Sequence, residues 1–597
     1  MNELNFEVKT RHRKKLFLMC MCVLLTMLLL SVRMGYLMIV ESDYYLARAE
    51  ELHERERKIK AARGRILDTN GVVLAANKTV CTISVIHSQV EEPERVSEML
   101  ASELGMNLED VKKKVQKLSS IEKIASNIDK ETGDKIREYG FSGVKVDEDY
   151  KRYYPYDTLA SKVLGFTGSD NQGIVGLEAK YDSVLMGDNG KILTLTDAWG
   201  VEIEGSEENR QEPIAGSDLY ISMDYNIQMY AQQLAERAMQ EKQAKRVSII
   251  VMNPQNGEIK AMVNVPEYNL NEPYELIPEP VYEQETKDGE TKSDTAQQTD
   301  TSVLTASTHM DQLNNMWRNF CINDTYEPGS VFKMFTATTA LETKAVSLSD
   351  TFNCCGYAMV ADRRIRCAKT TGHGQEDFTH SVMNSCNPAF IEWGRRVGTE
   401  RFFQYLGKMG VLTKTGIDLP GEATTIMHKQ ENVGEVELAT MSFGQSFQIT
   451  PIMMLRIAST VVNGGRLVTP HFAVKTMNAD GQTVQEYTYE NANQAIEPET
   501  SATMREILRQ VVENGGGNKA YIEGFSIGGK TATSEKLPRG TGKYISSFIG
   551  FSSVENPQII AMCLIDEPQG VYYGGTISAP VIRQLFENIL PYLDISE

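Results

Sequence analysis

The chain has 597 residues, of which 24% are charged and 41% hydrophobic, and its formal net charge is −19. This composition is ordinary for globular proteins and excludes wholesale disorder, a collagen-like fibre and a protein with many membrane spans. The negative charge argues against a nucleic-acid partner, because proteins that bind nucleic acids present a basic face. Nine cysteines are too few for a disulfide scaffold, and no HExxH or paired CxxC motif of a zinc enzyme occurs.

A basic cluster and then an apolar run begin the chain. The run from Leu16 to Val32, which continues past Arg33, is long enough for roughly 25 Å of helix. Arg33 lies near the helix end, where a long side chain extends to the membrane surface. Positive charge before the run places the N-terminus in the cytoplasm. The sequence therefore predicts an uncleaved signal-anchor, and not a cleaved signal peptide or a lipoprotein at Cys20 or Cys22, because the small residues that those need are absent.

The segments beyond the span predict two large modules. The first contains a charged helical stalk (41–60), a hairpin turning at Asn70-Gly71 (63–75), a mainly helical region (88–140), a Gly- and Asp-rich stretch (166–176) and mixed strands and turns. The second contains a strand (219–223), a helix (225–244), two strands joined by a turn (247–252 and 258–264), and a polar stretch without periodicity (284–309) that predicts a flexible insertion. The expected modules are a cytoplasmic tail (1–15), a membrane span (16–40), a first domain (41–215) and a second domain (216–597).

Ser330 and Lys333 begin a predicted helix directly after Pro328-Gly329. Residues three apart share a helix face, and a neutral lysine there can take the serine proton. The helix N-terminus adds partial positive charge. This is the SxxK arrangement of serine acyl-transfer enzymes. Taken alone, the pair also fits a helix cap with a surface lysine.

Two further SxxK copies show how weak the motif is by itself. They start at Ser120 and Ser142, lack the Pro-Gly lead, and precede no long apolar helix. We expect both to be surface residues of the first module. The assignment of Ser330 therefore depends on partner motifs elsewhere in the second module.

The first partner motif is Ser385-Cys386-Asn387, in a predicted loop between helices. A hydroxyl and a carboxamide two residues apart can both face a pocket, one relaying a proton and the other holding a substrate amide. The alternative is a polar loop that merely ends a helix. Another Ser-x-Asn copy, Ser169 to Asn171, falls in the wrong module.

The second partner motif is a predicted strand with Lys530, Thr531 and Thr533, paired with residues 544–551. Lysine and threonines on such a strand can bind a substrate carboxylate. The backbone N–H of Thr533 can join that of Ser330 as an oxyanion hole. A literal Lys-Thr-Gly at 414–416 is rejected because a turn follows it. The alternative for the strand is an edge protected by its lysine.

These three elements, in this order, resemble a penicillin-binding protein, and more narrowly a class B, monofunctional one. Further matching motifs are Arg63-Gly64-Arg65-Ile66, Gly176-Leu177-Glu178, Pro254 to Asn269, Gly444-Gln445 and Asn463-Gly464-Gly465. No glycosyltransferase-like module precedes the first domain. Within the family, the chain most resembles the stage V sporulation protein D group, and the division-septum transpeptidases are close.

The resemblance implies a multidomain α+β fold. We expect a single N-terminal transmembrane helix, an elongated mixed β/α pedestal or dimerisation domain (41–215), and a penicillin-binding transpeptidase domain with an antiparallel sheet flanked by helices (216–597). A polytopic membrane glycosyltransferase is the implied partner, and peptidoglycan stem peptides and β-lactams are the implied ligands. No metal or organic cofactor is implied.

The resemblance also implies peptidoglycan cross-linking through an acyl-serine, in spore cortex or septal wall synthesis. Ser330 attacks the D-Ala–D-Ala carbonyl while Lys333 acts as base. Ser385 relays the proton to the leaving D-alanine, and Asn387 holds the substrate amide. The implied binders of the terminal carboxylate are Lys530, Thr531 and Thr533.

Other activities share these motifs. A D,D-carboxypeptidase or a β-lactamase would have all three elements, although the pedestal and the anchor favour a transpeptidase. A β-lactam-sensing receptor would need several spans and a cytoplasmic effector. Ala532 stands where the family usually has glycine. Its methyl group can crowd a substrate, which supports the last alternative, a catalytically weak or inactive scaffold.

Cys367 and Cys386 resemble a cysteine pair of the sporulation group. One hypothesis is a disulfide between them that disturbs the active-site loop and stops activity. The alternative is buried free thiols. A metal site that adds Cys354, Cys355 and His373 fits no standard zinc spacing, so we expect none.

Overall fold

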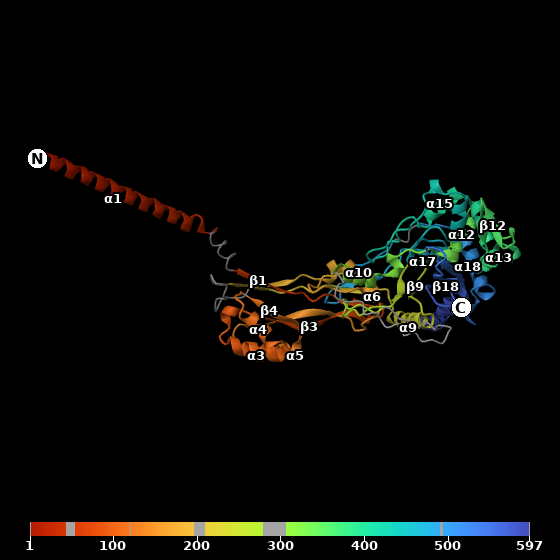
Figure 1. Cartoon of the computed structure of the whole chain (residues 1–597), viewed down its shortest axis with the longest axis horizontal. Coiled ribbons are helices and arrows are strands. Elements are labelled where there is room, and N and C mark those ends of the chain that lie inside the picture. Colours follow the sequence, from red (N-terminus) through yellow and green to blue (C-terminus); the bar gives the residue numbers. More distant parts are fainter. Residues whose placement is uncertain are drawn as a thin grey trace, which may run out of the picture. The chain divides into compact units, whose positions relative to one another are not determined.

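The computed structural model describes residues 2–42, 44, 54–119, 121–195, 209–278, 306–489 and 493–595 (Figure 1). The chain folds into two compact units. The first unit comprises residues 1–61, 79–150 and 188–214, and the second comprises residues 62–78, 151–187 and 215–597. Two segments of the predicted pedestal, 62–78 and 151–187, thus belong to the second unit.

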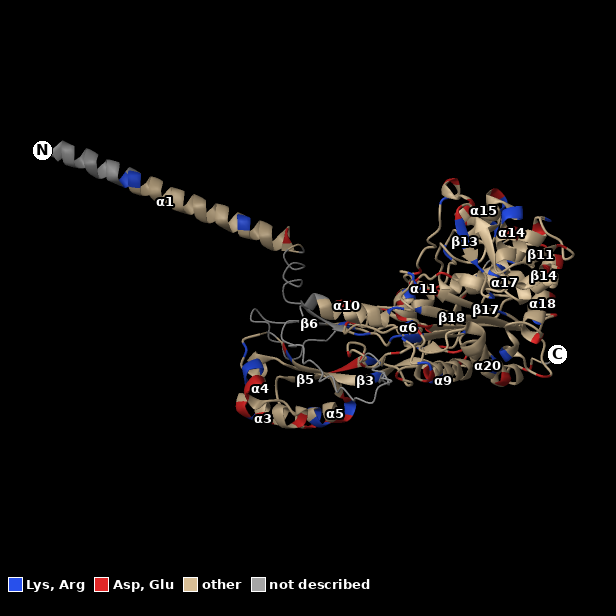
Figure 2. Ribbon diagram, turned by 45° about the vertical axis from the view of Figure 1, so that its right-hand side comes forward, with Lys and Arg blue, Asp and Glu red and all other residues tan. Residues whose placement is uncertain are grey.

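Helix α1 (Asn2–Ile39) contains the predicted membrane span. Its segment Lys15–Ile39 is long and apolar enough to cross a membrane. Figure 2 shows this part of α1 almost free of charged residues. Its leucine and methionine side chains are exposed, which in water would be unfavourable and in lipid is what a span requires. The predicted N-terminal apolar helix is confirmed, and among the described residues it is the one helix with the length and composition of a membrane span.

The predicted helical stalk is wrong over its last part. Residues Glu54–Ile59 form strand β1, which pairs antiparallel with β6 (Gly190–Leu195), and β6 in turn pairs with β7 (Asn209–Gln211). Ile59 faces Gly190 in this register. A strand partner some 130 residues further along the chain thus overrides the local helical preference of charged residues.

The remainder of the first unit is a small helical layer on a sheet. Its helices are α3 (Pro93–Leu104), α4 (Leu108–Val115) and α5 (Lys130–Glu138), and its strands include β4 (Glu122–Asp129) and parts of β3 (Val73–Val85) and β5 (Val144–Tyr153). Val96, Leu100 and Val111 pack against Ile83 and Ile124. Figure 2 shows the charged residues that these helices carry. The prediction that residues 88–140 are mainly helical is confirmed except for β4. Exposed polar residues interrupt the alternation of buried and exposed positions in β4, so the sequence there lacks a clear strand pattern.

The predicted hairpin is confirmed in the second unit. Strand β2 (Ile66–Leu67) pairs antiparallel with the start of β3, and Gly71 adopts a φ of +85° at the turn. The Asp68 carboxylate accepts hydrogen bonds from the backbone N–H groups of Asn70 and Val72, which fixes the turn. Alongside β2 lie, in order, β8 (Asp218–Ile221), β15 (Ala473–Met477) and β16 (Thr483–Glu486).

A five-stranded antiparallel sheet forms the centre of the second unit. Its order is β10 (Ile259–Val265), β9 (Arg246–Met252), β19 (Ile559–Asp566), β18 (Tyr544–Ser552) and β17 (Ile527–Glu535). Successive residues face opposite sides, as the period of a strand requires. In β9, Val247, Ile249 and Val251 enter one apolar cluster, while Ile250 and Met252 enter another.

Helices cover both faces of this sheet, as predicted. Helices α9 (Tyr225–Glu241) and α20 (Ala579–Tyr592) pack on one face. Helices α12 (Lys333–Glu342), α17 (Pro451–Val462) and α18 (Pro498–Glu513) lie on the other, where α17 contacts β19 and α18 contacts β17. Figure 1 shows α9 and α17 on opposite sides of β9 and β18. All twelve residues of α17 are buried, so this helix is the inner layer of the domain.

Shorter elements complete the second unit. Its other helices are α6 (Ser161–Leu164), α7 (Gly176–Lys180), α8 (Asp182–Leu185), α10 (Ala306–Trp317), α11 (Phe320–Asn323), α13 (Phe378–Met383), α14 (Asn387–Val397), α15 (Thr399–Lys408), α16 (Glu435–Met441) and α19 (Gly574–Ile577), with short 3-10 turns η3 (Gly329–Phe332), η4 (Gln430–Asn432) and η5 (Asn518–Ala520). Two separate ribbons are β11 (Thr351–Cys354) with β14 (Gly374–Asp377), and β12 (Tyr357–Val360) with β13 (Arg363–Arg366). The predicted insertion at 284–309 lies mostly outside the described residues, and its last four residues belong to α10 instead.

A buried ion-pair network lies at the Arg63 motif. Arg63 Nε donates to Glu178 Oε2 and Arg152 Nε donates to Glu178 Oε1, each at 2.6 Å. Arg63 Nη1 also donates to Asp182 Oδ1 at 2.7 Å. Glu178 has an exposed fraction of 0%. The carboxylates of Glu178 and Asp182 together therefore balance the charges of the two buried arginines, and this network joins residues 63, 152, 178 and 182 of the second unit.

We expect Glu178→Gln to destabilise the protein by about 3–5 kcal/mol, because it removes the charge that two buried arginines share. The matched control is Glu587→Gln on α20, which breaks the exposed Arg583–Glu587 pair and should cost less than about 1 kcal/mol. Denaturant unfolding of the two variants in detergent measures both changes. Equal losses of stability in the two variants would contradict the structural role of Glu178.

Candidate active site

Ser330 lies in the short turn η3, immediately before α12. Gly329 has a φ of +58°, and a Cβ there would meet Ser534 Oγ at 2.2 Å, so only glycine fits this approach of η3 to β17. Residues 333–340 of α12 are all buried. The serine is therefore held at the start of a rigid, completely packed helix, and it is itself half-buried.

Lys333, the first residue of α12 and three positions after Ser330, is fully buried. Its Nζ donates hydrogen bonds to Ser385 O at 2.7 Å, to Ser385 Oγ at 3.1 Å and to Asn387 Oδ1 at 2.7 Å. All three acceptors are uncharged. Desolvation consequently dominates and lowers the pKa of Lys333 to about 8. A lysine in this state can accept a proton near neutral pH.

The loop between α13 and α14 places Ser385 and Asn387 at that ammonium group. Ser385 has a φ of +52°, an uncommon conformation for a residue with a side chain. Backbone hydrogen bonds hold it there, from Ser385 N to Val382 O and from Cys386 N to Ser381 O. Asn387 begins α14, and its Nδ2 donates to Arg366 O.

The edge strand β17 forms the other wall of the site. It pairs with β18 on one side and contacts η3. Lys530 is buried, and its burial, with the nearby Lys333, lowers its pKa well below the ordinary value. Thr531 and Thr533 are half-buried on the alternate face of the strand. Gly574 N donates to Thr533 Oγ1 at 3.0 Å, which orients that hydroxyl.

Ala532 packs inward and does not stand on the open face of the strand. Its exposed fraction is 3%, and it belongs to the main apolar cluster of the second unit. The side chains that flank it, Thr531 and Thr533, point the other way, because successive strand residues alternate. Crowding by this methyl group was the sequence argument for an inactive scaffold, and the burial of Ala532 weakens it.

The three predicted elements thus meet around Lys333. The rejected copies that the structure describes do not join them, and Ser120, which begins another copy, lies outside the described residues. Thr415, in the literal Lys-Thr-Gly, donates from its N and Oγ1 to Glu422 and lies outside any strand. Ser142 is an exposed residue of the first unit. Asn171 O accepts a hydrogen bond from Arg63 in the buried ion-pair network.

One contact beside Ser330 was not predicted. Arg539, in the loop between β17 and β18, forms an ion pair with Glu327, three residues before the serine. Glu327 Oε1 also accepts from Ser446 N at 2.8 Å. These contacts connect the loop that follows β17 to the segment leading into η3. The sequence signal was the acidic residue directly before Pro328-Gly329.

Four potential metal ligands also converge next to the Ser385 loop. Cys354, Cys367, His373 and Cys386 place their ligand atoms within 4.8 Å of one another. Cys367 Sγ is 3.7 Å from His373 Nδ1. A hydrogen bond from the Cys386 thiol is the main cause that lowers the pKa of Cys367, to about 5. All nine cysteines are free thiols, and Cys355 is exposed and outside this group.

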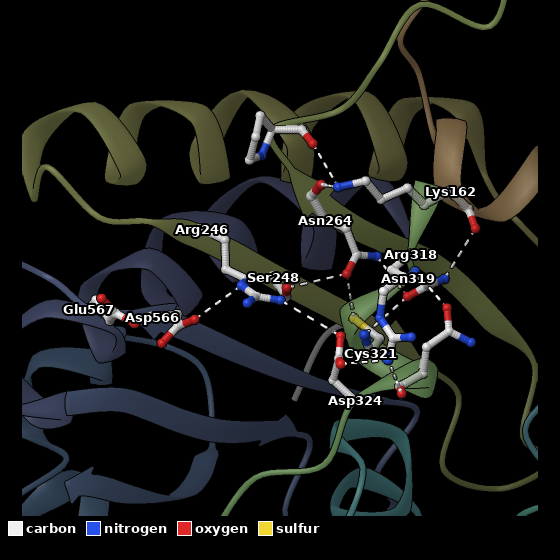
Figure 3. Close-up of polar contacts among 12 residues, drawn as sticks. Lys162, Arg246, Ser248, Asn264, Arg318, Asn319, Cys321, Asp324, Asp566 and Glu567 are labelled. Carbon is white, nitrogen blue, oxygen red and sulfur yellow. Dashed lines mark hydrogen bonds and ion pairs between the residues drawn. The ribbon is translucent and has the colours of Figure 1, made fainter. Parts of the chain in front are cut away.

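A separate polar cavity of about 1050 Å³ lies elsewhere in the second unit. Figure 3 shows polar contacts between residues that line this cavity, such as Lys162 and Arg246, and neighbouring residues, such as Asp566. Lys162 Nζ donates to Asn264 O and Pro266 O, and Arg246 pairs with Asp566. Lys162 and Arg246 therefore have partners within the protein, and none of the predicted catalytic residues lines the cavity.

Family models match the two large parts of the chain. Residues 247–587 match the penicillin-binding protein transpeptidase domain. Residues 58–221 match the penicillin-binding protein dimerisation domain. The three elements predicted to be catalytic all fall within the first of these matches, and the Arg63 motif falls within the second.

Similar proteins cover nearly the whole chain. Stage V sporulation protein D of Bacillus subtilis is 36% identical over 592 residues, 98% of this chain and 86% of its own length. Peptidoglycan D,D-transpeptidase FtsI of Escherichia coli is 25% identical over 97% of this chain and 92% of its own length. Penicillin-binding protein 2X of Streptococcus thermophilus shares the fold, with a TM-score of 0.72, 20% identity, and coverage of 91% of this chain and 81% of its own. The chain therefore belongs to the class B penicillin-binding proteins, in which a dimerisation domain accompanies a transpeptidase domain.

Proposed function

We propose that the protein is a peptidoglycan D,D-transpeptidase that cross-links stem peptides through an acyl-serine intermediate. The observation that carries the proposal is the buried Lys333, hydrogen-bonded to Ser385 and Asn387 and one helical turn from Ser330. Its relatives include a sporulation protein and a division transpeptidase. The role is therefore cross-linking in spore cortex or septal wall.

Acylation follows from the positions of these groups. Neutral Lys333 takes the Ser330 hydroxyl proton while Oγ attacks the carbonyl carbon of the penultimate D-alanine. The backbone N–H groups of Ser330 and Thr533 bind the oxyanion that forms. The carbon–nitrogen bond then breaks, and the proton passes from Lys333 through Ser385 Oγ to the leaving amine of D-alanine.

Substrate positioning falls to the remaining residues. Asn387 holds a substrate amide, and Thr531 and Thr533, on the open face of β17, bind the terminal carboxylate. Lys530 lies on the buried face of the same strand, near Lys333. An amine of a second stem peptide attacks the ester, returns the proton to Ser330 and forms the cross-link. A β-lactam presents a carboxylate and a strained amide to the same groups, so it acylates the same serine.

The proposed topology follows from the basic residues before the span. The N-terminus lies in the cytoplasm, and both folded units lie outside the membrane, where peptidoglycan is. The membrane helix and the pedestal together are the surfaces proposed to contact a polytopic glycosyltransferase, which supplies the glycan strands that this protein cross-links.

We expect Ser330→Ala to abolish covalent labelling by a fluorescent penicillin, because the acyl bond forms on that hydroxyl. The matched control is Ser142→Ala, which changes the same residue type in another SxxK sequence and should leave labelling unchanged. Gel fluorescence after denaturation reports the covalent product. Persistent labelling of a folded Ser330→Ala protein would contradict the assignment of Ser330 as the acylated residue.

The acylation rate should depend on pH through Lys333. Because the neutral amine is the base and its pKa is lowered to about 8, the rate should rise about tenfold per unit below that pH and level off above it. Stopped-flow acylation by a fluorescent penicillin between about pH 6 and pH 9 measures the profile. A flat profile below pH 8 would count against Lys333 as base.

The topology predicts which cysteines an impermeant reagent reaches. Cys355 is exposed, so a membrane-impermeant maleimide should label it in intact protoplasts. Asn5→Cys in a Cys355→Ser chain should be labelled only after the membrane is opened. The reverse pattern would place the folded units in the cytoplasm.

A further inference from the structure

We propose that the outer face of the ribbon β12–β13 binds a carboxylate of the stem peptide, on a residue that precedes D-Ala–D-Ala. The residues assigned to this contact are Arg364 and Arg366. The inference rests on the proposed transpeptidase function and deepens it, because it names the charge of the peptide that the site prefers. Its test separates the two, since a neutral peptide and a penicillin report acylation by themselves.

Positive charge is concentrated in a short stretch around β13. The exposed residues Arg363, Arg364, Arg366 and Lys369 lie close together in the sequence, and the acidic residue next to them is Asp362. The chain as a whole has a formal net charge of −19, so this stretch differs from the rest of the protein. None of the four basic side chains forms an ion pair with another described residue. Their charges are therefore available to an anionic ligand.

The basic residues on the other wall of the active site, in contrast, are paired. In the loop between β17 and β18, Lys536 forms ion pairs with Asp566 and Glu567. Arg539 of the same loop forms an ion pair with Glu327. Of the two segments that border the site, the ribbon β12–β13 is thus the one that offers unpaired exposed cations. A peptide carboxylate is favoured on that side.

The end of β13 contacts the active site through its main chain. Asn387 Oδ1 accepts a hydrogen bond from Lys333 Nζ at 2.7 Å, and Asn387 Nδ2 donates to Arg366 O at 3.3 Å. Arg366 is therefore two hydrogen bonds away from the proposed base. Two residues of extended peptide span roughly 7 Å. A peptide with its reacting carbonyl at Ser330 and an amide at Asn387 would thus bring its preceding residues to β13.

The pleat of β13 places both arginines on the solvent side. Ile365 is half-buried and packs against the main apolar cluster of the second unit. Arg364 and Arg366 lie on the opposite face, because successive strand residues alternate. Across the ribbon, Arg364 is opposite Met359 and Arg366 is opposite Tyr357. The outer face therefore presents two guanidinium groups beside an aromatic ring and a thioether.

Stacking on an uncharged ring prepares Arg364 for a carboxylate. Its guanidinium carbon lies 3.8 Å from the centroid of the Tyr357 ring. A guanidinium group that stacks through its face keeps its N–H groups in the plane, where two of them match the two oxygens of a carboxylate. The ring thus restrains the side chain without neutralising its charge.

The two walls would then hold the two ends of the donor peptide. Its terminal carboxylate is assigned to Thr531 and Thr533 on β17, so Arg364 and Arg366 on the opposite wall are left for a carboxylate nearer the start of the peptide. Stem peptides carry free carboxylates on residues before the terminal D-alanines. Because exposed ion pairs contribute little energy, we expect this contact to select and orient the peptide and not to accelerate the chemical step.

The test compares two synthetic peptides on the full-length chain in detergent at low salt. Both end in D-Ala–D-lactate, an ester that can acylate Ser330. They differ only two positions before that D-alanine, where one has glutamate and the other glutamine. Chromatography of the products gives kcat/KM for each. We expect the glutamate peptide to be preferred about threefold to tenfold, mainly through KM. The preference should shrink as salt is raised, because salt screens exposed charges.

Variants then assign the preference to the ribbon. Arg364→Gln combined with Arg366→Gln should bring the ratio of the two kcat/KM values close to one. Arg366→Lys keeps the charge and should retain most of the preference, which a purely structural role would not explain. The matched control is Arg237→Gln, at an exposed arginine of α9, and it should keep the full ratio. Labelling by a fluorescent penicillin reports in each sample whether Ser330 is still acylated.

Four outcomes overturn the inference. A ratio near one in an unmodified chain that turns over both peptides leaves the transpeptidase function intact and removes the carboxylate contact. An unchanged ratio in the double variant assigns that contact to other residues. Inhibition by a glycerol phosphate oligomer that requires Arg364 and Arg366, with a peptide ratio near one, assigns the ribbon to an anionic polymer instead. A folded chain that neither peptide nor penicillin acylates contradicts the proposed function, and the inference with it.

Discussion

The burial of the Lys333 ammonium without a carboxylate partner is the constraint on which the active site depends. Its three acceptors are a backbone carbonyl, a hydroxyl and a carboxamide oxygen. A carboxylate in their place would stabilise the charged form of Lys333 and raise its pKa, which would disfavour the proposed role as a base. Neutral acceptors satisfy its hydrogen bonds and leave desolvation as the larger effect, which lowers its pKa.

The Arg63 network follows the opposite logic. There, two buried cations share the carboxylate of Glu178, and a third pairing comes from Asp182. These charges are compensated, so the arginines stay charged and hold backbone segments together without taking part in proton transfer. The same unit thus contains two kinds of buried cation. The acceptor type separates them, because carboxylates pair with the arginines and neutral oxygens with Lys333.

Local patterns predicted much of this fold. The Asn70-Gly71 hairpin, the strands of residues 247–264 and the helix after Ser330 each depend on neighbours in the sequence, and each was predicted. Strand β1 was missed because its partner β6 lies some 130 residues away and no local signal reports it. The residues of the three predicted motifs lie close together in the structure, and motif order and resemblance, not spacing, led to that prediction. The Glu327–Arg539 pair was missed because it joins residues more than two hundred positions apart.

The cysteine cluster is another feature that local sequence patterns could not predict, because its members come from separate segments. Zinc motifs are recognised in sequence when two ligands sit on one turn, whereas here β11, the end of β13 and the Ser385 loop contribute separately. Cys386 lies between Ser385 and Asn387, which both accept hydrogen bonds from Lys333. Because the three residues are consecutive, the position of Cys386 constrains the positions of its two neighbours. Whatever holds the Cys386 sulfur, whether a metal, a second sulfur or only packing, therefore also decides how firmly Ser385 and Asn387 are presented to Lys333. The same loop that completes the catalytic site is, for this reason, the place where a bond made outside the site can act on it.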